Sequence, residues 1–383
     1  MTEYYLLIKN ASIYDPLTNT FIKEDLAICK DKIAKRGKNL YVEAQHTIDA
    51  KNYFLSPGFI DHHCHLYQGS DNGVNADNYA LPLGCTSLCD AGSTGCSNFK
   101  DFYFNNINNS ICKIYAYLNV GSSGQVSEKC PENVNPDAIE DSRIKDLCQK
   151  YPCIRGLKLR YDNCCVNNND LAPLIHAQEL AKSLGLSLCV HFSNHPRPLA
   201  DICSILDKGD ILCHTYNKQG ESIIDEKGNL LPCIKKAREN GIIFDSADGF
   251  KNFSFNIIRQ AINLDFLPDI ISTDIINSRA FTSTAYGLTY TMSKYLGLGI
   301  DLKEIIKSVT TTPLEAMKIK TDSFMKEGAF ADLCLFKLQE VEKFRITDAY
   351  GESLDLKQII LPKVTICKGK IAYASLDLWG NNY

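Results

Sequence analysis

The sequence contains no stretch of about twenty consecutive apolar residues, no Cys-x-x-Cys pair and no strong excess of one charge. A helix needs about twenty apolar residues to cross a bilayer, so the first absence argues against a membrane-spanning segment. Zinc ribbons and dithiol redox sites use Cys-x-x-Cys pairs, so the second absence argues against both. The formal net charge of -4 gives no electrostatic reason to expect nucleic acid or an anionic membrane as a partner.

Cysteine itself is abundant, with 17 in 383 residues, and the odd number excludes a complete set of intramolecular disulfides. Most cysteines stand inside apolar runs, which is typical of small reduced hydrophobic side chains. A chemical role stays open for Cys64 and for the pair Cys164–Cys165. The first residues, MTEYYLLIKN, include the acidic Glu3 and no long apolar core, unlike a signal peptide. We therefore expect a cytoplasmic protein.

Two kinds of secondary-structure pattern occur along the chain. The first fifty residues and the residues from Lys326 onward show short alternating strands separated by turns. Between them, short apolar segments alternate with amphipathic ones, and a helix is expected over residues 278–297. The apolar segments predict eight buried strands, over residues 54–61, 85–90, 113–120, 154–161, 187–192, 210–215, 242–248 and 269–274.

Buried strands that alternate with helices pair in parallel, and eight of them favour an α/β fold, a (β/α)8 TIM barrel. An open doubly wound sheet is the alternative. The two ends of the chain are expected to pair into one small β-sandwich domain. The predicted division is therefore residues 1–54 with 325–383 for the β-sandwich, and residues 55–324 for the barrel.

Histidines gather where the predicted strands end. The stretch PGFIDHHCHL places three of the eight histidines within four residues, and His63 and His65 share one face because side chains alternate along an extended chain. In a (β/α)8 barrel the reactive groups lie at the carboxyl ends of the strands. Those ends carry, in order, His63, His65, Lys158, Arg160, His191, His214 and Asp274.

Each of these residues taken alone has a structural interpretation. A strand-end histidine is more often hydrogen-bonded than metal-bound, and a strand-end aspartate usually caps a turn or helix. Lys158 is harder to explain this way, because a lysine inside a barrel must lose its charge or find an anion. Together the residues predict a metal site, since imidazole and carboxylate donors suit Zn²⁺, Mn²⁺, Fe²⁺ or Ni²⁺. A lysine that has reacted with CO₂ becomes an anionic carbamate able to bridge two cations.

The same stretches resemble a known family. PGFIDHHCH is similar to the PGxxDxHxH motif of the amidohydrolase superfamily, and GCTSLCDAGSTG, YAYLNVGSSG, IRGLKLR, VHFSN, DILCHTYN, ISTD, TTTPLEAM and EGAFADLCLF follow in that family's order. The resemblance covers nearly the whole chain. It is strongest to the dihydroorotase-like branch of metallo-dependent deacetylases, near the D-aminoacylases and acyl-mandelate esterases.

The resemblance implies a role for each residue. His63 and His65 would bind the more buried of two divalent metal ions, most simply Zn²⁺, and carbamylated Lys158 would bridge both ions. His191 and His214 would bind the more exposed ion. Asp274 would contact the buried ion and act as the catalytic proton carrier, while a hydroxide held between the metals attacks the substrate. Arg160 would pair with the carboxylate of a small-molecule substrate. The resemblance also implies a possible homo-oligomer, since a dimer or larger assembly is common in the family.

Two positions depart from the family pattern. Relatives often carry histidine in the seventh strand segment, where this chain reads DSADG and places Asp248, which we expect to contact substrate. Relatives often read Leu-His after the last aspartate, where this chain has Ile275 and Ile276. The expected reaction is hydrolysis of an amide or ester of an N-acyl amino acid or acyl-hydroxy acid. The alternatives are a cyclic amidohydrolase of the dihydroorotase or hydantoinase type and a non-catalytic scaffold.

Overall fold

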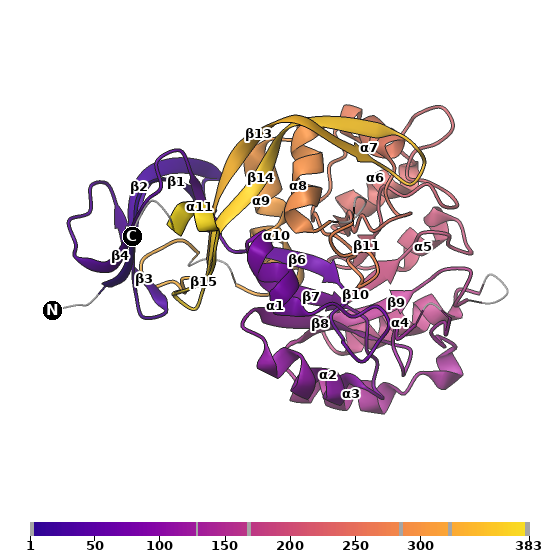
Figure 1. Cartoon of the computed structure of the whole chain (residues 1–383). Helices are drawn as coiled ribbons and strands as arrows, with labels where there is room; N and C mark the ends of the chain where they lie inside the picture. The colour runs from indigo at the N-terminus through magenta and orange to yellow at the C-terminus, as the bar shows by residue number, and fades with distance from the viewer. Residues whose placement is uncertain (1–3, 128, 167–169, 283–285, 321–323, 380–383) are drawn as a thin grey trace.

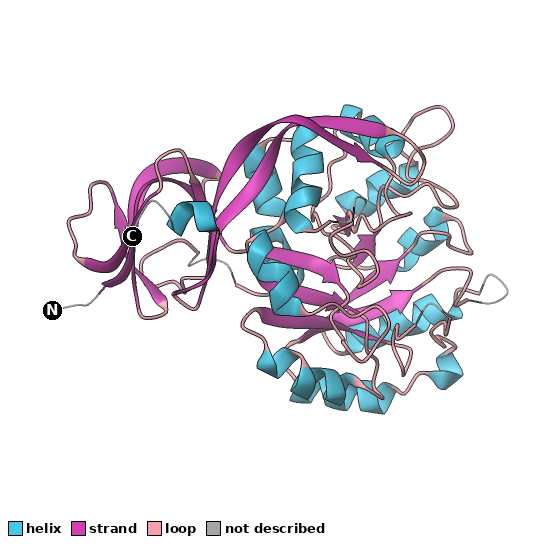
Figure 2. Cartoon of the chain, viewed as in Figure 1, coloured by secondary structure: helices cyan, strands magenta, loops and turns pink. Residues whose placement is uncertain are grey.

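The structure, a computed structural model, describes residues 4–127, 129–166, 170–282, 286–320 and 324–379. Two parts lie next to each other, a sheet built from both ends of the chain and a larger part in which strands alternate with helices (Figure 1, Figure 2). Residues 1–3 and 380–383, which the sequence assigns to the terminal domain, lie outside the described residues. Among the described residues, no helix is both long enough and apolar enough to cross a membrane.

The terminal sheet joins the two ends of the chain around a short central strand. Its strands follow the order β15-β14-β13-β5-β1-β2-β3, with β4 paired to β1. β5 hydrogen-bonds to β1 on one side and to β13 on the other, so both ends of the chain meet there. Alternate apolar side chains of these strands face one shared core, as the period of a strand requires. The bounds are β1 Tyr4–Asp15, β2 Thr20–Cys29, β3 Lys32–Gly37, β4 Ala44–Asp49, β5 Phe54–Pro57, β13 Leu333–Thr347, β14 Ser353–Cys367 and β15 Lys370–Ala374.

The second part is the predicted barrel. Seven parallel strands follow each other in chain order, and every residue of β7 is buried, as expected when helices cover a parallel sheet. The strands are β6 Phe59–Cys64, β7 Cys85–Ala91, β8 Lys113–Asn119, β9 Ile154–Arg160, β10 Ser187–His191, β11 Ile211–Cys213 and β12 Ile243–Asp245. The α-helices are α1 Ala76–Ala80, α2 Phe99–Asn105, α3 Asp141–Lys150, α4 Ala172–Ser183, α5 Leu199–Ile205, α6 Pro232–Glu239, α7 Phe255–Asn263, α8 Leu288–Gly297, α9 Leu302–Ser308, α10 Thr311–Ala316 and α11 Leu376–Trp379. Short 3₁₀ helices are η1 Leu81–Leu83, η2 Ile107–Asn109 and η3 Pro136–Ala138.

An eighth segment closes the ring between β12 and β6. It makes only isolated parallel bridges, from Ile270 to Asp245 on β12 and from Ile275 to Cys64 on β6. Asp61 of β6 reinforces this closure, because its carboxylate accepts hydrogen bonds from the backbone N–H of Thr273 (3.1 Å) and from its hydroxyl (2.6 Å). The predicted strand over residues 269–274 is therefore present as a barrel-closing segment with sparse pairing.

Two predicted elements differ from the structure. The strand expected over residues 54–61 is divided at Gly58, because β5 belongs to the terminal sheet and β6 to the barrel. A side chain at Gly58 would collide with Thr86, since an added Cβ would lie 2.1 Å from its hydroxyl oxygen. The helix expected over residues 278–297 begins only at Leu288, since residues 277–281 form turns. Residues 283–285 of that stretch lie outside the described residues.

The hairpin β13–β14 leaves the terminal sheet and runs across the helices of the barrel (Figure 1). At its tip, Asp348 accepts a hydrogen bond from the backbone N–H of Phe255 at the start of α7 (2.8 Å), and Glu352 pairs with Arg259 (2.7 Å). Tyr350 donates a hydrogen bond to the carbonyl oxygen of Lys251 (2.8 Å). The hairpin therefore holds the loop that follows β12.

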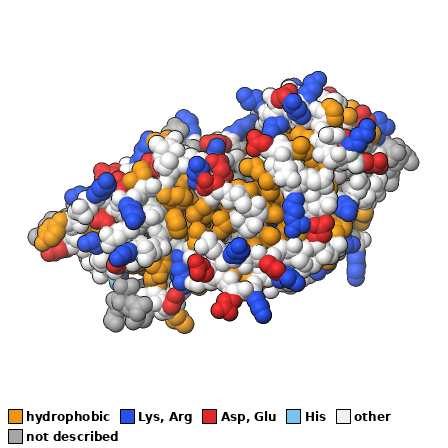
Figure 3. All heavy atoms as spheres, turned by 90° about the horizontal axis from the view of Figure 1, so that it is seen from above, with side chains coloured by type: hydrophobic (Ala, Val, Ile, Leu, Met, Phe, Trp, Pro, Cys, Tyr) orange, Lys and Arg blue, Asp and Glu red, His pale blue; other side chains and the backbone are white. Residues whose placement is uncertain are grey.

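On this face of the molecule, charged side chains of both signs surround an apolar area (Figure 3).

All cysteines are free, and most are buried in the large hydrophobic core and in the barrel interior. Cys64 is fully buried, its thiol donates to the carbonyl oxygen of Cys89 (3.2 Å), and burial raises its pKa well above the usual value. A nucleophilic cysteine needs a lowered pKa and access to substrate, so Cys64 has a packing role. Cys164 is exposed and Cys165 is half-buried.

Gly156 is tightly packed in β9, two residues before Lys158. An added Cβ there would lie 2.3 Å from the ring of Tyr117 and 2.7 Å from the carbonyl oxygen of Ser187. We expect Gly156→Ala to lower the free energy of unfolding by about 1–3 kcal/mol through overpacking. Chemical denaturation would measure this loss. Gly37→Ala is the matched control, because its added Cβ makes one ordinary contact of 3.8 Å, and equal stability of both variants would contradict the expectation.

Candidate active site

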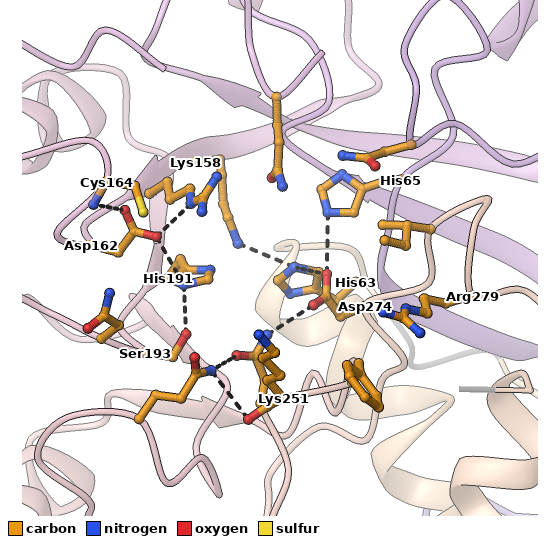
Figure 4. Close-up of a pocket in the computed structure, with 18 residues that line it drawn as sticks. His63, His65, Lys158, Asp162, Cys164, His191, Ser193, Lys251, Asp274 and Arg279 are labelled. Atoms are coloured by element: carbon orange, nitrogen blue, oxygen red, sulfur yellow. Dashed lines mark hydrogen bonds and ion pairs between the residues drawn. The ribbon is translucent and has the colours of Figure 1, made fainter. Parts of the chain in front are cut away.

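The predicted residues meet at the carboxyl ends of the barrel strands, around a cavity of about 410 Å³ (Figure 4). Loops that follow the strands complete the wall of this cavity. Its lining comprises His63, His65, Asn72, Gln125, Lys158, Arg160, Asp162, Cys164, His191, Ser193, Asn194, Gln219, Phe250, Lys251, Asn252, Asp274, Ile276 and Arg279.

The two histidines of β6 face the aspartate of the closing segment. Nε2 of His63 lies 3.5 Å from Oδ1 of Asp274, and Nε2 of His65 lies 3.3 Å from the same oxygen. Nδ1 of His65 lies 2.9 Å from the hydroxyl of Ser93, which leaves Nε2 directed at the shared site. Asp274 has a positive φ of 53°, a conformation that non-glycine residues seldom adopt and that often marks a functional site.

Lys158 reaches the same site from β9. Its side chain is almost fully buried, and its Nζ lies 3.4 Å from Nε2 of His63 and 3.1 Å from Sγ of Cys213. Gly92 leaves room for it, since a Cβ at that residue would lie 2.6 Å from Cγ of Lys158. No carboxylate in the described residues pairs directly with this ammonium, so the amine lies among imidazole and thiol groups.

The remaining two histidines lie against each other on the next strands. The ring centroids of His191 and His214 are 4.3 Å apart, and that of His214 is 5.1 Å from the ring of His63. His214 has a φ of 71°, and its Nδ1 lies 2.8 Å from the carbonyl oxygen of Ala247, which fixes the tautomer that leaves Nε2 free to bind a metal. Nε2 of His191 lies 2.7 Å from the hydroxyl of Ser193.

The buried setting controls the charges of these groups. Burial lowers the pKa of His214 to about 3, and burial together with the neighbouring cations lowers the pKa of His191 well below its usual value. Both imidazoles are therefore neutral near pH 7, which is the form that binds metals. Burial alone would raise the pKa of Asp274, but hydrogen bonding to His65 and the nearby imidazoles hold it well below its usual value. Asp274 is therefore ionised.

Two predicted substrate contacts have other partners. Asp248 is buried away from the cavity lining, and its carboxylate lies 2.6 Å from Nζ of Lys294 and accepts a hydrogen bond from Tyr295 (3.0 Å). The structure thus does not bring Asp248 to the cavity. Arg160 does line it, but its guanidinium already pairs with Asp162 (2.8 Å) and with the buried Glu132 (3.4 Å).

The structure also reveals residues that sequence patterns did not identify. His62 points away from the metal-facing histidines and joins Asp245 (3.2 Å) to the hydroxyl of Tyr117 (3.0 Å) inside the barrel. Asn252 donates a hydrogen bond to Oδ2 of Asp274 (3.2 Å). Asp245 ends a strand, so position alone could have suggested it, whereas Asn252 lies in a loop without any periodic signal.

These residues fit a divalent metal ion. The donor atoms of His63, His65 and Asp274 lie within 4.8 Å of one another, and so do those of His63, Cys213 and His214. Nδ1 of His63 is buried without a hydrogen-bond partner among the described residues, although Oδ2 of Asp245 lies 3.7 Å away. Imidazoles with an ionised carboxylate form the donor set that zinc and related ions take.

Comparison with known proteins points in one direction. No family model matches the chain. A deacetylase of Agrobacterium fabrum is 30% identical over 348 residues, which cover 90% of this chain and 85% of that protein. A deacetylase of Enterococcus faecalis is 28% identical over 374 residues, covering 96% of this chain and 99% of that protein.

Solved structures agree with these relatives. A dihydroorotase superposes with a TM-score of 0.88 at 29% identity, covering 97% of this chain and 99% of that one. An adenine deaminase superposes with a TM-score of 0.89 at 28% identity, covering 97% and 100%. The expected fold, a (β/α)8 barrel with a terminal β domain, is confirmed. With a relative 30% identical over most of both chains, and with histidines, lysine and aspartate at the ends of its barrel strands, this chain belongs to the amidohydrolase superfamily of metal-dependent hydrolases.

Proposed function

We propose that this enzyme hydrolyses an amide or ester bond of a small acyl compound, of the N-acyl amino acid or acyl-hydroxy acid type. The observation that carries the proposal is the group formed by His63, His65, Lys158, His214 and Asp274 beside a cavity of about 410 Å³. That volume suits a small molecule. The relatives named deacetylases, which align over most of the chain, support an acyl substrate.

Two divalent ions, Zn²⁺ by preference, would occupy the site. His63 and His65 would hold one, His191 and His214 the other, and Lys158 as its carbamate would bridge them. The unpaired setting of the Lys158 amine supports this assignment, because a carbamate would replace a buried cation by an anion that metals can balance. When bound, such ions lower the pKa of water and polarise a carbonyl group.

The residues of the chain then supply proton transfer and orientation. Asp274 is ionised and can accept a proton from the attacking water and pass it to the leaving nitrogen or oxygen. Asn252 holds one oxygen of this carboxylate by a hydrogen bond, so the other, Oδ1, stays directed at His63 and His65. The loop containing Asn252 is in turn anchored by Tyr350 of the hairpin.

A cyclic amidohydrolase is the second candidate. It is favoured by the dihydroorotase structure, which aligns with nearly the whole chain. The same site would serve both reactions, since an acyclic and a cyclic amide need the same attack on a carbonyl carbon. The two candidates differ only in the shape of substrate that the cavity accepts, so parallel assays with both substrate types distinguish them.

Metal content tests the site directly. We expect about two metal ions per chain in protein purified without chelator, and a loss of most of this metal in His65→Ala and in Lys158→Ala. His176→Ala is the matched control and should retain all metal, because His176 of α4 pairs with Asp141 at the start of α3, outside the cavity lining. Elemental analysis measures the stoichiometry. One ion per chain would contradict the bridging role of Lys158, and no ion after reconstitution with zinc and bicarbonate would favour the non-catalytic scaffold.

The role of Asp274 predicts a different outcome from that of the other ligands. We expect Asp274→Asn to keep most of its metal while kcat falls by about 10²–10⁴-fold, the range typical of a lost general acid–base group. Steady-state rates on acetylated amino acids, measured beside metal content, check this. A near-normal rate in Asp274→Asn would refute the proton-transfer role.

A further inference from the structure

The two arginines that line the cavity differ in their acidic partners. Arg160 has two acidic partners, Asp162 and Glu132, so little of its charge is available to a ligand. Arg279 also lines the cavity, but its guanidinium makes no ion pair with any acidic side chain in the described residues. A guanidinium without an acid at the wall of a binding cavity is a ready partner for an anionic group.

The position of Arg279 is fixed by two loops. It lies five residues after Asp274, in the loop that leaves the barrel-closing segment, and its backbone N–H bonds to the carbonyl oxygen of Ile276 (2.9 Å). Its guanidinium carbon lies 4.2 Å from the ring centroid of Phe250, in the loop after β12. Figure 4 shows the guanidinium end of Arg279 extending from this wall toward Asp274. The stacked ring limits the freedom of the side chain, which lowers the entropy lost when it binds.

We propose that Arg279, rather than Arg160, binds the carboxylate of the substrate and makes the enzyme selective for small acyl compounds that carry a negative charge. The inference rests on the proposed hydrolase function and names the substrate class of the same site. A planar guanidinium can hold a carboxylate by two parallel hydrogen bonds. Since Arg279 follows Asp274 by only five residues and points toward it (Figure 4), the anchored group would lie near the proton-transfer group, which favours substrates with the acid close to the scissile bond.

Binding of compounds that cannot be hydrolysed tests Arg279 apart from turnover. The probes are N-methanesulfonyl amino acids and their neutral carboxamides, titrated by calorimetry into the metal-loaded full-length enzyme. We expect the wild type to bind the carboxylates roughly 10- to 100-fold more tightly than the carboxamides, as for a charge-assisted pair. Arg279→Gln should remove that preference, and Arg279→Lys should retain part of it. Arg143→Gln, on the exposed face of α3, is the matched control and should retain it fully.

Several outcomes would overturn the proposal. The first is that the wild type shows no preference for the carboxylate probes. The second is that Arg279→Gln retains the preference. The third is that Arg160→Gln or Lys251→Gln loses the preference while Arg279→Gln retains it. Rates on charged and neutral acetyl compounds separate this from the proposed function. Hydrolysis of both without a carboxylate preference leaves the hydrolase standing and removes only the role of Arg279. Absence of hydrolysis removes the hydrolase, while the calorimetry still decides about Arg279.

Discussion

The buried carboxylate of Asp61 joins the first barrel strand to the closing segment, and the geometry of the site depends on that junction. It lies inside β6, two residues before His63, and it accepts hydrogen bonds from Thr273 and from the hydroxyl of Tyr79 (2.6 Å). Thr273 immediately precedes Asp274, so this contact fixes the separation between the first and last ligands along the chain. Burial raises the pKa of Asp61 to about 6, and the donated hydrogen bonds oppose that shift. Backbone bonds add to this contact, since the N–H of Asp274 bonds to the carbonyl oxygen of His63 (2.7 Å) and the N–H of His65 bonds to that of Ile275 (3.0 Å).

The strain at the site depends on the same closure. His214 and Asp274 both have positive φ, and such backbone conformations persist at non-glycine residues only where surrounding contacts impose them. Ala247, whose carbonyl oxygen accepts from the imidazole of His214, lies two residues after β12, beside the closing segment, where the N–H of Ser246 bonds to the carbonyl oxygen of Ile270 (2.9 Å). The contacts that close the ring therefore also orient the ligand side chains.

Much of this arrangement could be predicted from the sequence. Eight apolar segments gave the barrel, and the strand-end rule identified the ligand candidates, because both depend on local patterns. The features that the sequence did not reveal depend on pairing between distant residues. Asp248 follows β12, where a functional residue is expected. Its partner Lys294 lies on α8, however, and the sequence around Asp248 gives no indication of that ion pair. Gly58 divides two strands that belong to different sheets, although the apolar run continues through it. Arg279 lies in turns without periodicity, so only its place in three dimensions, at the cavity wall without an acidic partner and stacked on Phe250, identifies it.

The terminal sheet is more than a support at one end of the barrel. Its hairpin contacts the loop after β12 through Tyr350 and the start of α7 through Asp348, and that loop carries both Asn252 and Phe250. Asn252 touches the carboxylate of Asp274, and Phe250 stacks on Arg279. The loop after β12, held by the hairpin, therefore contacts both Asp274, the proposed proton carrier, and Arg279, the proposed substrate-binding residue. Because the two ends of the chain must pair to form that sheet, these contacts between the hairpin and the loop can form only after the whole barrel sequence has been synthesised.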